Sequence, residues 1–178
     1  MTNSVTQFVR VLGSLLVVFG AQFAVAAIPS LQAKVQKQDK YIENGLIKGG
    51  EAAKAFSLVD FRWAYGKEKG IERMIFEFGD GRGEPLKGRP GYFQVNVDSL
   101  SRMVTVDFSQ VSGSRLDQAE LAKRLKASPY IQNVKMNYDP VDSTLTLTFK
   151  VSKAVRVEAF ELPNQPKGGR LALDFRGK

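Results

Sequence analysis

Apolar and polar residues alternate with period two through most of the chain from residue 57 onward, which predicts strands that bury one face each. The alternation is cleanest in residues 144–151, where leucine, phenylalanine and valine alternate with threonine and lysine. The same pattern recurs, less strictly, in residues 57–65, 71–78, 92–97, 102–108, 131–138, 155–162 and 170–175. The sequence therefore predicts an all-β domain.

One short helix is expected between the fourth and fifth of these strands. Leu121 and Leu125 lie on one face of such a helix, and Pro129 ends it. Ser114 is placed to cap its N-terminus, with Asp117 three residues later. The helix divides the strands into two halves of four.

The two halves end alike, with VTVDF at residues 104–108 and LALDF at residues 171–175. This similarity predicts an internal duplication. Because each half offers four strands with one apolar face, we expect two four-stranded sheets packed as a sandwich, with the short helix between the halves.

Residues 1–26 are typical of a secretory signal peptide. Arg10 precedes an apolar run over residues 11–23, and small residues follow at positions 24–27. The run has thirteen residues, whereas a spanning helix needs about 20. We expect export across the membrane by this signal, and the alternative is an uncleaved N-terminal segment that anchors the protein. Residues 27–56 show no sustained period and predict a polar linker, so the domain is expected over residues 57–178.

Composition excludes most catalytic chemistries. The 178 residues contain no Cys and no His, which excludes a Ser-His-Asp triad, a thiol nucleophile, a disulfide framework and the usual zinc site. The acidic residues Glu77 and Asp80 leave a wall hydrolase as an enzymatic alternative, although nothing in the sequence gives them a desolvated cleft. We therefore expect a protein that is not an enzyme and that uses neither a cofactor nor a metal.

The chain is basic, with 26 Lys+Arg, 18 Asp+Glu and a formal net charge of +8. Removal of residues 1–26 takes away one Arg and no acid, which leaves +7. An exported basic protein is expected to associate with polyanions such as the cell wall, whereas the export signal argues against nucleic acid as a partner.

The second half resembles the AMIN domain family. The residues that carry the resemblance are VRVEAFEL at 155–162 and RLALDF at 170–175, and residues 58–108 are similar in layout. AMIN domains occur in cell-wall amidases and type IV pilus secretins of bacteria with an outer membrane, where they are non-catalytic periplasmic modules that bind peptidoglycan. The resemblance covers roughly residues 57–176 and implies the same role here, without stable membrane insertion after signal cleavage.

Within this family, binding is attributed to the outer sheet faces near the Asp-containing strands. Alternation along each strand places two aspartates and several arginines on outer faces. Guanidinium groups there can bind the carboxylates of peptide stems in bidentate fashion. The candidate ligand-binding residues are Arg62, Arg73, Asp107, Arg156, Arg170 and Asp174. The alternative is structural: each arginine is an ordinary solvated charge, or each aspartate pairs with a neighbouring arginine.

A second function of a different class stays open at this point. The protein can instead be an interaction subunit of an envelope assembly, such as a secretin or pilus machine, that docks a partner strand on an exposed sheet edge or face. The expected partners are therefore peptidoglycan or an envelope protein complex.

Overall fold

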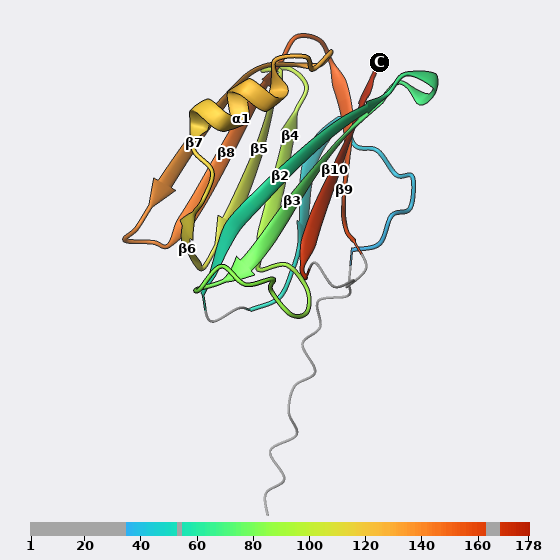
Figure 1. Cartoon of the computed structure of the whole chain (residues 1–178). Helices are drawn as coiled ribbons and strands as arrows, with labels where there is room; N and C mark the ends of the chain where they lie inside the picture. The colour runs from blue at the N-terminus through green and yellow to red at the C-terminus, as the bar shows by residue number, and fades with distance from the viewer. Residues whose placement is uncertain (1–34, 53–54, 163–167) are drawn as a thin grey trace, which may run out of the picture. The chain divides into compact units, whose positions relative to one another are not determined.

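The computed structural model describes residues 35–52, 55–162 and 168–178, which form two sheets and one short helix (Figure 1). The predicted signal peptide lies outside the described residues. The strands are β1 (Asn44–Gly49), β2 (Phe56–Gly66), β3 (Ile71–Asp80), β4 (Phe93–Asp98), β5 (Met103–Ser109), β6 (Val111–Ser114), β7 (Ile131–Asp139), β8 (Thr144–Val151), β9 (Val155–Glu161) and β10 (Arg170–Gly177). Helix α1 spans Gln118–Leu125, and the 3-10 turn η1 spans Lys67–Lys69.

Each sheet has five strands. Sheet A has the order β6-β2-β3-β10-β9, and sheet B has the order β1-β4-β5-β8-β7. Among these described strands, neighbours are antiparallel except β2 and β6, which run parallel. Helix α1 contacts β7 of sheet B and β2 of sheet A, so it lies beside both sheets (Figure 1).

The core lies between the two sheets, because the inward positions of their strands are apolar. Phe76 of β3 contacts Phe108 of β5, with ring centroids 5.7 Å apart. Phe149 of β8 likewise contacts Phe175 of β10 at 6.3 Å. Full burial of one such side chain is worth about 1.5–3 kcal/mol, so these rings hold the two sheets together. The all-β, sandwich-like class expected from the alternation is confirmed.

The predicted division into two four-stranded sheets, one from each half, is wrong. In the first half, β2 and β3 lie in sheet A while β4 and β5 lie in sheet B. In the second half, β7 and β8 lie in sheet B while β9 and β10 lie in sheet A. Each sheet gains a fifth strand at one edge, β6 in sheet A and β1 in sheet B. These two strands are short and lack clear alternation, so periodicity did not predict them.

The described part of the predicted linker belongs to the fold. Strand β1 pairs with β4 over its whole length. Residues 35–42, called the strap from here on, run along the free edge of β9: the backbone N–H of Glu161 donates to Val35, and Ile42 and Val157 exchange two hydrogen bonds. Between these points the strap makes no regular ladder with β9, which explains why its sequence shows no strand period.

A β-bulge interrupts the predicted alternation in β2. The register with β3 shifts between Leu58 and Asp60. Leu58 and Phe61 are both buried in the core, whereas Val59 is only partly buried. The sequence pattern predicts Val59 and Phe61 on one face, and this prediction fails because the bulge inserts one extra residue between the two core positions.

The cap of α1 also differs from the prediction. Asp117 caps the helix, and its side chain accepts a hydrogen bond from the backbone N–H of Glu120 at 2.8 Å. Ser114 instead ends β6, where its hydroxyl donates to the carbonyl of Leu116. Both residues are good N-caps, and the helix begins after the one that lies clear of the strand.

Candidate functional site

Five of the six predicted site residues lie on the outer face of sheet A. In β10, the residues that alternate with the buried Leu171 and Leu173 point outward, and the cross-strand register carries this face across β3 and β9. The five are Arg62, Arg73, Arg156, Arg170 and Asp174. The sixth, Asp107, lies on the outer face of sheet B. The two aspartates of the repeated strand motif therefore lie on opposite faces of the domain.

Asp174 is fully buried although it points away from the core. Its two carboxylate oxygens accept hydrogen bonds from Nε and Nη2 of Arg73, each at 2.6 Å. This is a bidentate ion pair across neighbouring strands, and the hydrogen bonds from Arg73 to Asp174 raise the pKa of Arg73. For these two residues, the structure matches the alternative in which the aspartate pairs with a neighbouring arginine.

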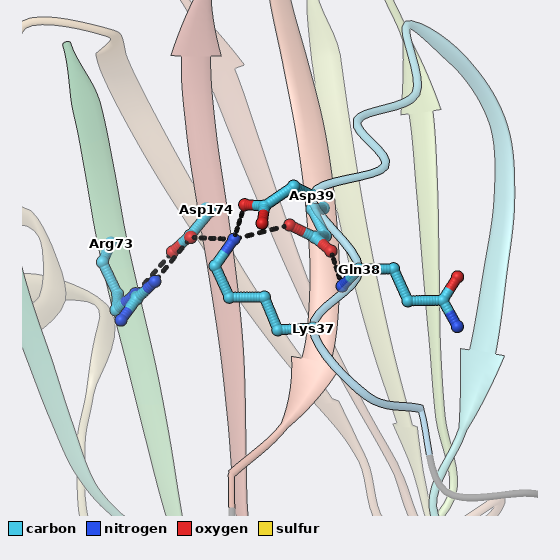
Figure 2. A network of polar contacts seen from close by, with 6 residues as sticks. Lys37, Gln38, Asp39, Arg73 and Asp174 are labelled. Atoms are coloured by element: carbon cyan, nitrogen blue, oxygen red, sulfur yellow. Dashed lines mark hydrogen bonds and ion pairs between the residues drawn. The ribbon is translucent and has the colours of Figure 1, made fainter. Parts of the chain in front are cut away.

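The strap covers this ion pair with a second cation. Figure 2 shows the ammonium group of Lys37 surrounded by carboxylates. Lys37 Nζ lies 3.8 Å from Asp174 Oδ2 and 3.1 Å from Glu158 Oε2, and it also donates a hydrogen bond to Asp39. The backbone N–H of Gln38 donates to the other oxygen of Glu158 at 2.7 Å. The strap is thus bound to β9 and β10 through their outward-facing acids.

The charge of Lys37 is stabilised by these acids. Burial acts to lower the pKa of Lys37, but its hydrogen bonds to Asp39 and Glu158 outweigh burial and raise that pKa. Lys37 Nζ also lies 5.5 Å from the centroid of the Phe160 ring, and the Arg73 guanidinium lies 5.2 Å from the same centroid. Such cation–π contacts add about 0.5–1 kcal/mol each at partly exposed sites.

The strap begins at another buried acid, Glu161 at the end of β9. Arg89 donates to it through Nε at 2.7 Å and Nη2 at 2.6 Å. The backbone N–H groups of Val35 and Gly50 donate to the same carboxylate. Burial acts to raise the pKa of Glu161, but the hydrogen bonds from Arg89 and these two amides outweigh it, and the pKa is lowered.

Arg156 and Arg176 form a cationic pair on the outer face of sheet A. They lie directly opposite each other on β9 and β10. Among the described residues, neither guanidinium has an ion pair within 4.0 Å, and Arg156 Nε is buried without a hydrogen-bond partner. Like charges at opposite positions repel each other, so this pair favours an anion between or above the two groups. Arg176 is not among the residues predicted from the sequence, although alternation from Asp174 places it on the same face.

Arg62 and Arg170 flank one acid on the same face. Arg62 Nη2 lies 2.9 Å from Glu77 Oε1, in a contact without hydrogen-bond geometry. Arg62 also lies 3.5 Å from Asp60. Arg170 is directly opposite Glu77 in the register of β10 and β3. Arg62 is therefore more strongly compensated by acids than Arg156 and Arg176, and Arg170 lies on the strand opposite the same acid.

The outer face of sheet B is chemically different. Asp107 is half-buried there and accepts a hydrogen bond from the Thr146 hydroxyl at 2.6 Å. Its other cross-strand neighbour is Gln94. The face is formed mainly by uncharged amides and hydroxyls, among them Gln94, Asn96, Thr105, Thr144, Thr146, Thr148 and Asn137. Asp107 thus lies apart from the arginines with which the sequence analysis grouped it.

A scan against models of known protein families finds no match to this chain, and a search among curated proteins finds no relative. The resemblance to the AMIN family therefore stays a prediction. Within residues 35–52, 55–162 and 168–178, no cluster of acidic side chains is arranged to hold a metal ion. In the same residues, no helix has the length and apolar character needed to cross a membrane.

Proposed function

We propose that the protein is a non-catalytic periplasmic module that binds peptidoglycan through the outer face of sheet A. The observation that carries this proposal is the pair Arg156 and Arg176, two arginines opposite each other that have no carboxylate within 4.0 Å among the described residues. Stem peptides of peptidoglycan carry carboxylates, which guanidinium groups bind in bidentate fashion. The formal net charge of +7 that remains after removal of residues 1–26 adds a long-range attraction to anionic surfaces.

The predicted residues take two different roles in this proposal. Arg156 and Arg176 contact the ligand carboxylate, and Arg62 and Arg170 extend the cationic surface along β2 and β10. Arg73 and Asp174 do not contact the ligand. Their ion pair holds the strap and the strands β3 and β10 in place beneath it.

The strand order supports an internal duplication and, with it, the resemblance to the AMIN family. If the halves are exchanged, β2, β3, β4 and β5 take the places of β7, β8, β9 and β10. The order β2-β3-β10-β9 in sheet A then becomes β7-β8-β5-β4, which is the order in sheet B read backwards. We infer a duplicated unit of four strands, to which β1 and β6 are added at the sheet edges.

The periplasmic location rests on the predicted signal peptide over residues 1–26. Cell fractionation with mass spectrometry of the recovered protein tests it. A mature chain that begins near residue 27 in the periplasmic fraction agrees with cleavage. Recovery of the full chain in the inner-membrane fraction would favour the uncleaved anchor instead.

Co-sedimentation with purified sacculi across a salt series tests wall binding. The double variant Arg156→Glu/Arg176→Glu removes the proposed contact, and the variant Lys48→Glu/Lys150→Glu makes the same charge change on the outer face of sheet B. At about 0.15 M salt, where long-range attraction is screened, we expect the first variant to bind at least about tenfold more weakly, a difference of about 1.4 kcal/mol. The second variant should bind like the wild type. Equal losses in both variants would contradict a defined site.

A further inference from the structure

Glu72, near the start of β3, is an acid buried inside the sandwich. It alternates with the core residues Met74 and Phe76, and none of the three is exposed to solvent. Among the described residues, no Lys or Arg lies within 4.0 Å of its carboxylate. A buried carboxylate without a cation is costly when it is ionised, so this position favours the protonated acid.

Neutral groups supply the hydrogen bonds of this carboxyl instead. The indole Nε1–H of Trp63 donates to one oxygen of Glu72, and the Ser128 hydroxyl donates to the other at 2.8 Å. Burial raises the pKa of Glu72, and the hydrogen bonds from Ser128 and Trp63 oppose this effect only in part. Since glutamic acid in an unfolded chain has a pKa of about 4.3, Glu72 in the folded protein takes up its proton at a higher pH.

Glu72 also joins the two sheets at one end of the sandwich. Residues 126–130, called the α1–β7 connection from here on, lead from α1 to β7 of sheet B. The Ser128 hydroxyl, which donates to Glu72, accepts hydrogen bonds from the backbone N–H groups of Tyr130 at 3.1 Å and Ile131 at 2.7 Å. The Tyr130 hydroxyl donates to the carbonyl of Gly70 at 2.7 Å. The connection is therefore fastened to the hairpin of β2 and β3 at two points, and one of them is an acid.

The ionisable groups around Glu72 are two tyrosines and one lysine. Tyr65 lies directly opposite Glu72 on β2, and its ring meets the Tyr130 ring edge to face, with centroids 6.1 Å apart. Lys153 Nζ, in the turn between β8 and β9, lies 4.9 Å from the centroid of the Tyr130 ring. Phe175, the neighbour of Glu72 on β10, is uncharged. Tyrosine and lysine ordinarily titrate near pH 10, and the chain contains no His. Between about pH 5 and pH 8, Glu72 is therefore the group of this cluster that can titrate.

We propose that Glu72 is a pH-sensitive latch, which holds the α1–β7 connection to sheet A while the carboxyl is protonated and releases it when the carboxyl ionises. Ionisation leaves an uncompensated negative charge between the sheets, and water reaches that charge only if the connection moves away. Such a movement exposes Leu125 and Tyr130, which are buried in the closed form. Because the pKa of Glu72 is raised by folding, the latch stabilises the protein fully below about pH 4.3, and this stabilisation is lost as the pH rises through the folded pKa.

A pH titration of ¹⁵N-labelled protein tests the latch. Trp63 is the one tryptophan of the sequence, so its indole N–H gives a single signal that reports on Glu72. We expect this signal to shift with a midpoint above the ordinary value of glutamic acid, about 4.3. Across the same midpoint, hydrogen exchange of the Tyr130 and Ile131 amides, corrected for intrinsic base catalysis, should become at least about tenfold faster. A midpoint at or below about pH 4.3, or unchanged protection of these two amides, would overturn the proposal.

Two variants separate the titration from the latch. Glu72→Gln keeps the shape of the side chain but cannot ionise, so the indole signal should not titrate and the Tyr130 and Ile131 amides should stay protected at every pH. Ser128→Ala keeps the acid and removes its link to the connection, so the indole signal should still titrate while both amides exchange rapidly throughout. The control Glu77→Gln, on the opposite face of β3, should behave like the wild type.

A pH-dependent loss of protection that persists in Glu72→Gln would assign the effect to another group and contradict the latch. Retained protection of both amides in Ser128→Ala would contradict it as well, because the hydroxyl is the link between the acid and the connection. These measurements use no wall ligand, so their outcome is independent of the proposed binding to peptidoglycan.

Discussion

The outer faces of the two sheets carry equivalent aspartates in opposite environments. Asp174 in β10 lies directly opposite Arg73 in β3, and Asp107 in β5 lies directly opposite Thr146 in β8. Asp174 is fully buried and holds a bidentate ion pair, whereas Asp107 is half-buried and accepts a bond from a hydroxyl. The same strand motif thus leads to two environments, because the residue across the strand and the segment above it differ.

The strap contributes to this difference, beside the cross-strand partner. On sheet A, the strap runs along β9 and brings Lys37 over Asp174 and Glu158. On sheet B, the equivalent strand β4 pairs regularly with β1. A buried charge is stable only when it is paired with an opposite charge. The acids that the strap covers on sheet A, Asp174 and Glu158, are accordingly paired with cations. Among the described residues, Arg156 and Arg176 have no ion pair within 4.0 Å on this face, whereas the outer face of sheet B offers mainly neutral groups.

The largest expected effect is the loss of folding stability when Asp174 is removed, and removal of Asp107 provides the comparison. Asp174→Ala leaves Arg73 and Lys37 without their shared carboxylate and should destabilise the protein by about 3 kcal/mol, the lower end for a buried pair because the Arg73 side chain is 38% exposed. Asp107→Ala loses one hydrogen bond and should cost about 1 kcal/mol. Urea unfolding followed by tryptophan fluorescence measures both. Equal costs would mean that the two environments do not differ in energy.

A smaller effect is expected from Glu161, and it depends on pH. The pKa of this carboxyl is lowered in the folded protein, so its stabilisation is complete above the unfolded pKa, about 4.3, and is lost as the pH falls through the folded pKa. Glu161→Gln should cost about 2 kcal/mol near pH 7, and the difference from the wild type should shrink below about pH 4.

Asp98 on sheet B provides the control for this titration. Its pKa is also lowered, by hydrogen bonds from Ser101, but the side chain is only partly buried and, among the described residues, has no ion pair within 4.0 Å. Asp98→Asn should therefore change the pH dependence of unfolding much less than Glu161→Gln. A larger change for Asp98→Asn than for Glu161→Gln would contradict the assignment of the buried ion pairs to sheet A.

The smallest effect concerns the strap itself. Lys37→Met removes the ammonium from Asp174 and Glu158 and should cost about 1 kcal/mol, because the side chain is 33% exposed and its ion pairs are partly screened. Hydrogen exchange of the Gln38 and Ile42 amides should become faster. Lys48→Met on β1 should leave both quantities unchanged. Unaltered exchange in the Lys37 variant would show that the strap is held by its backbone contacts alone.

Alternation along the strands predicted which residues point outward but not what they meet. It placed Arg73 and Asp174 correctly on an outer face. Their ion pair, however, forms only because β3 and β10 lie side by side in sheet A, and these two strands are far apart in the sequence. The strap was missed because Lys37 is held by acids of β9 and β10, and such contacts leave no periodic signal. Arg176, in contrast, was predictable from its place two residues after Asp174.

Titration of ¹⁵N-labelled protein with a soluble muropeptide tests the central claim most directly, because it distinguishes the two faces in one experiment. We predict that the Nε–H signals of Arg156 and Arg176 shift, that Asp107 and Thr146 are unaffected, and that amidation of the stem-peptide carboxylates weakens binding by at least about tenfold. Shifts centred on Asp107 and Thr146, or equal binding of the amidated muropeptide, would contradict recognition of wall carboxylates by sheet A.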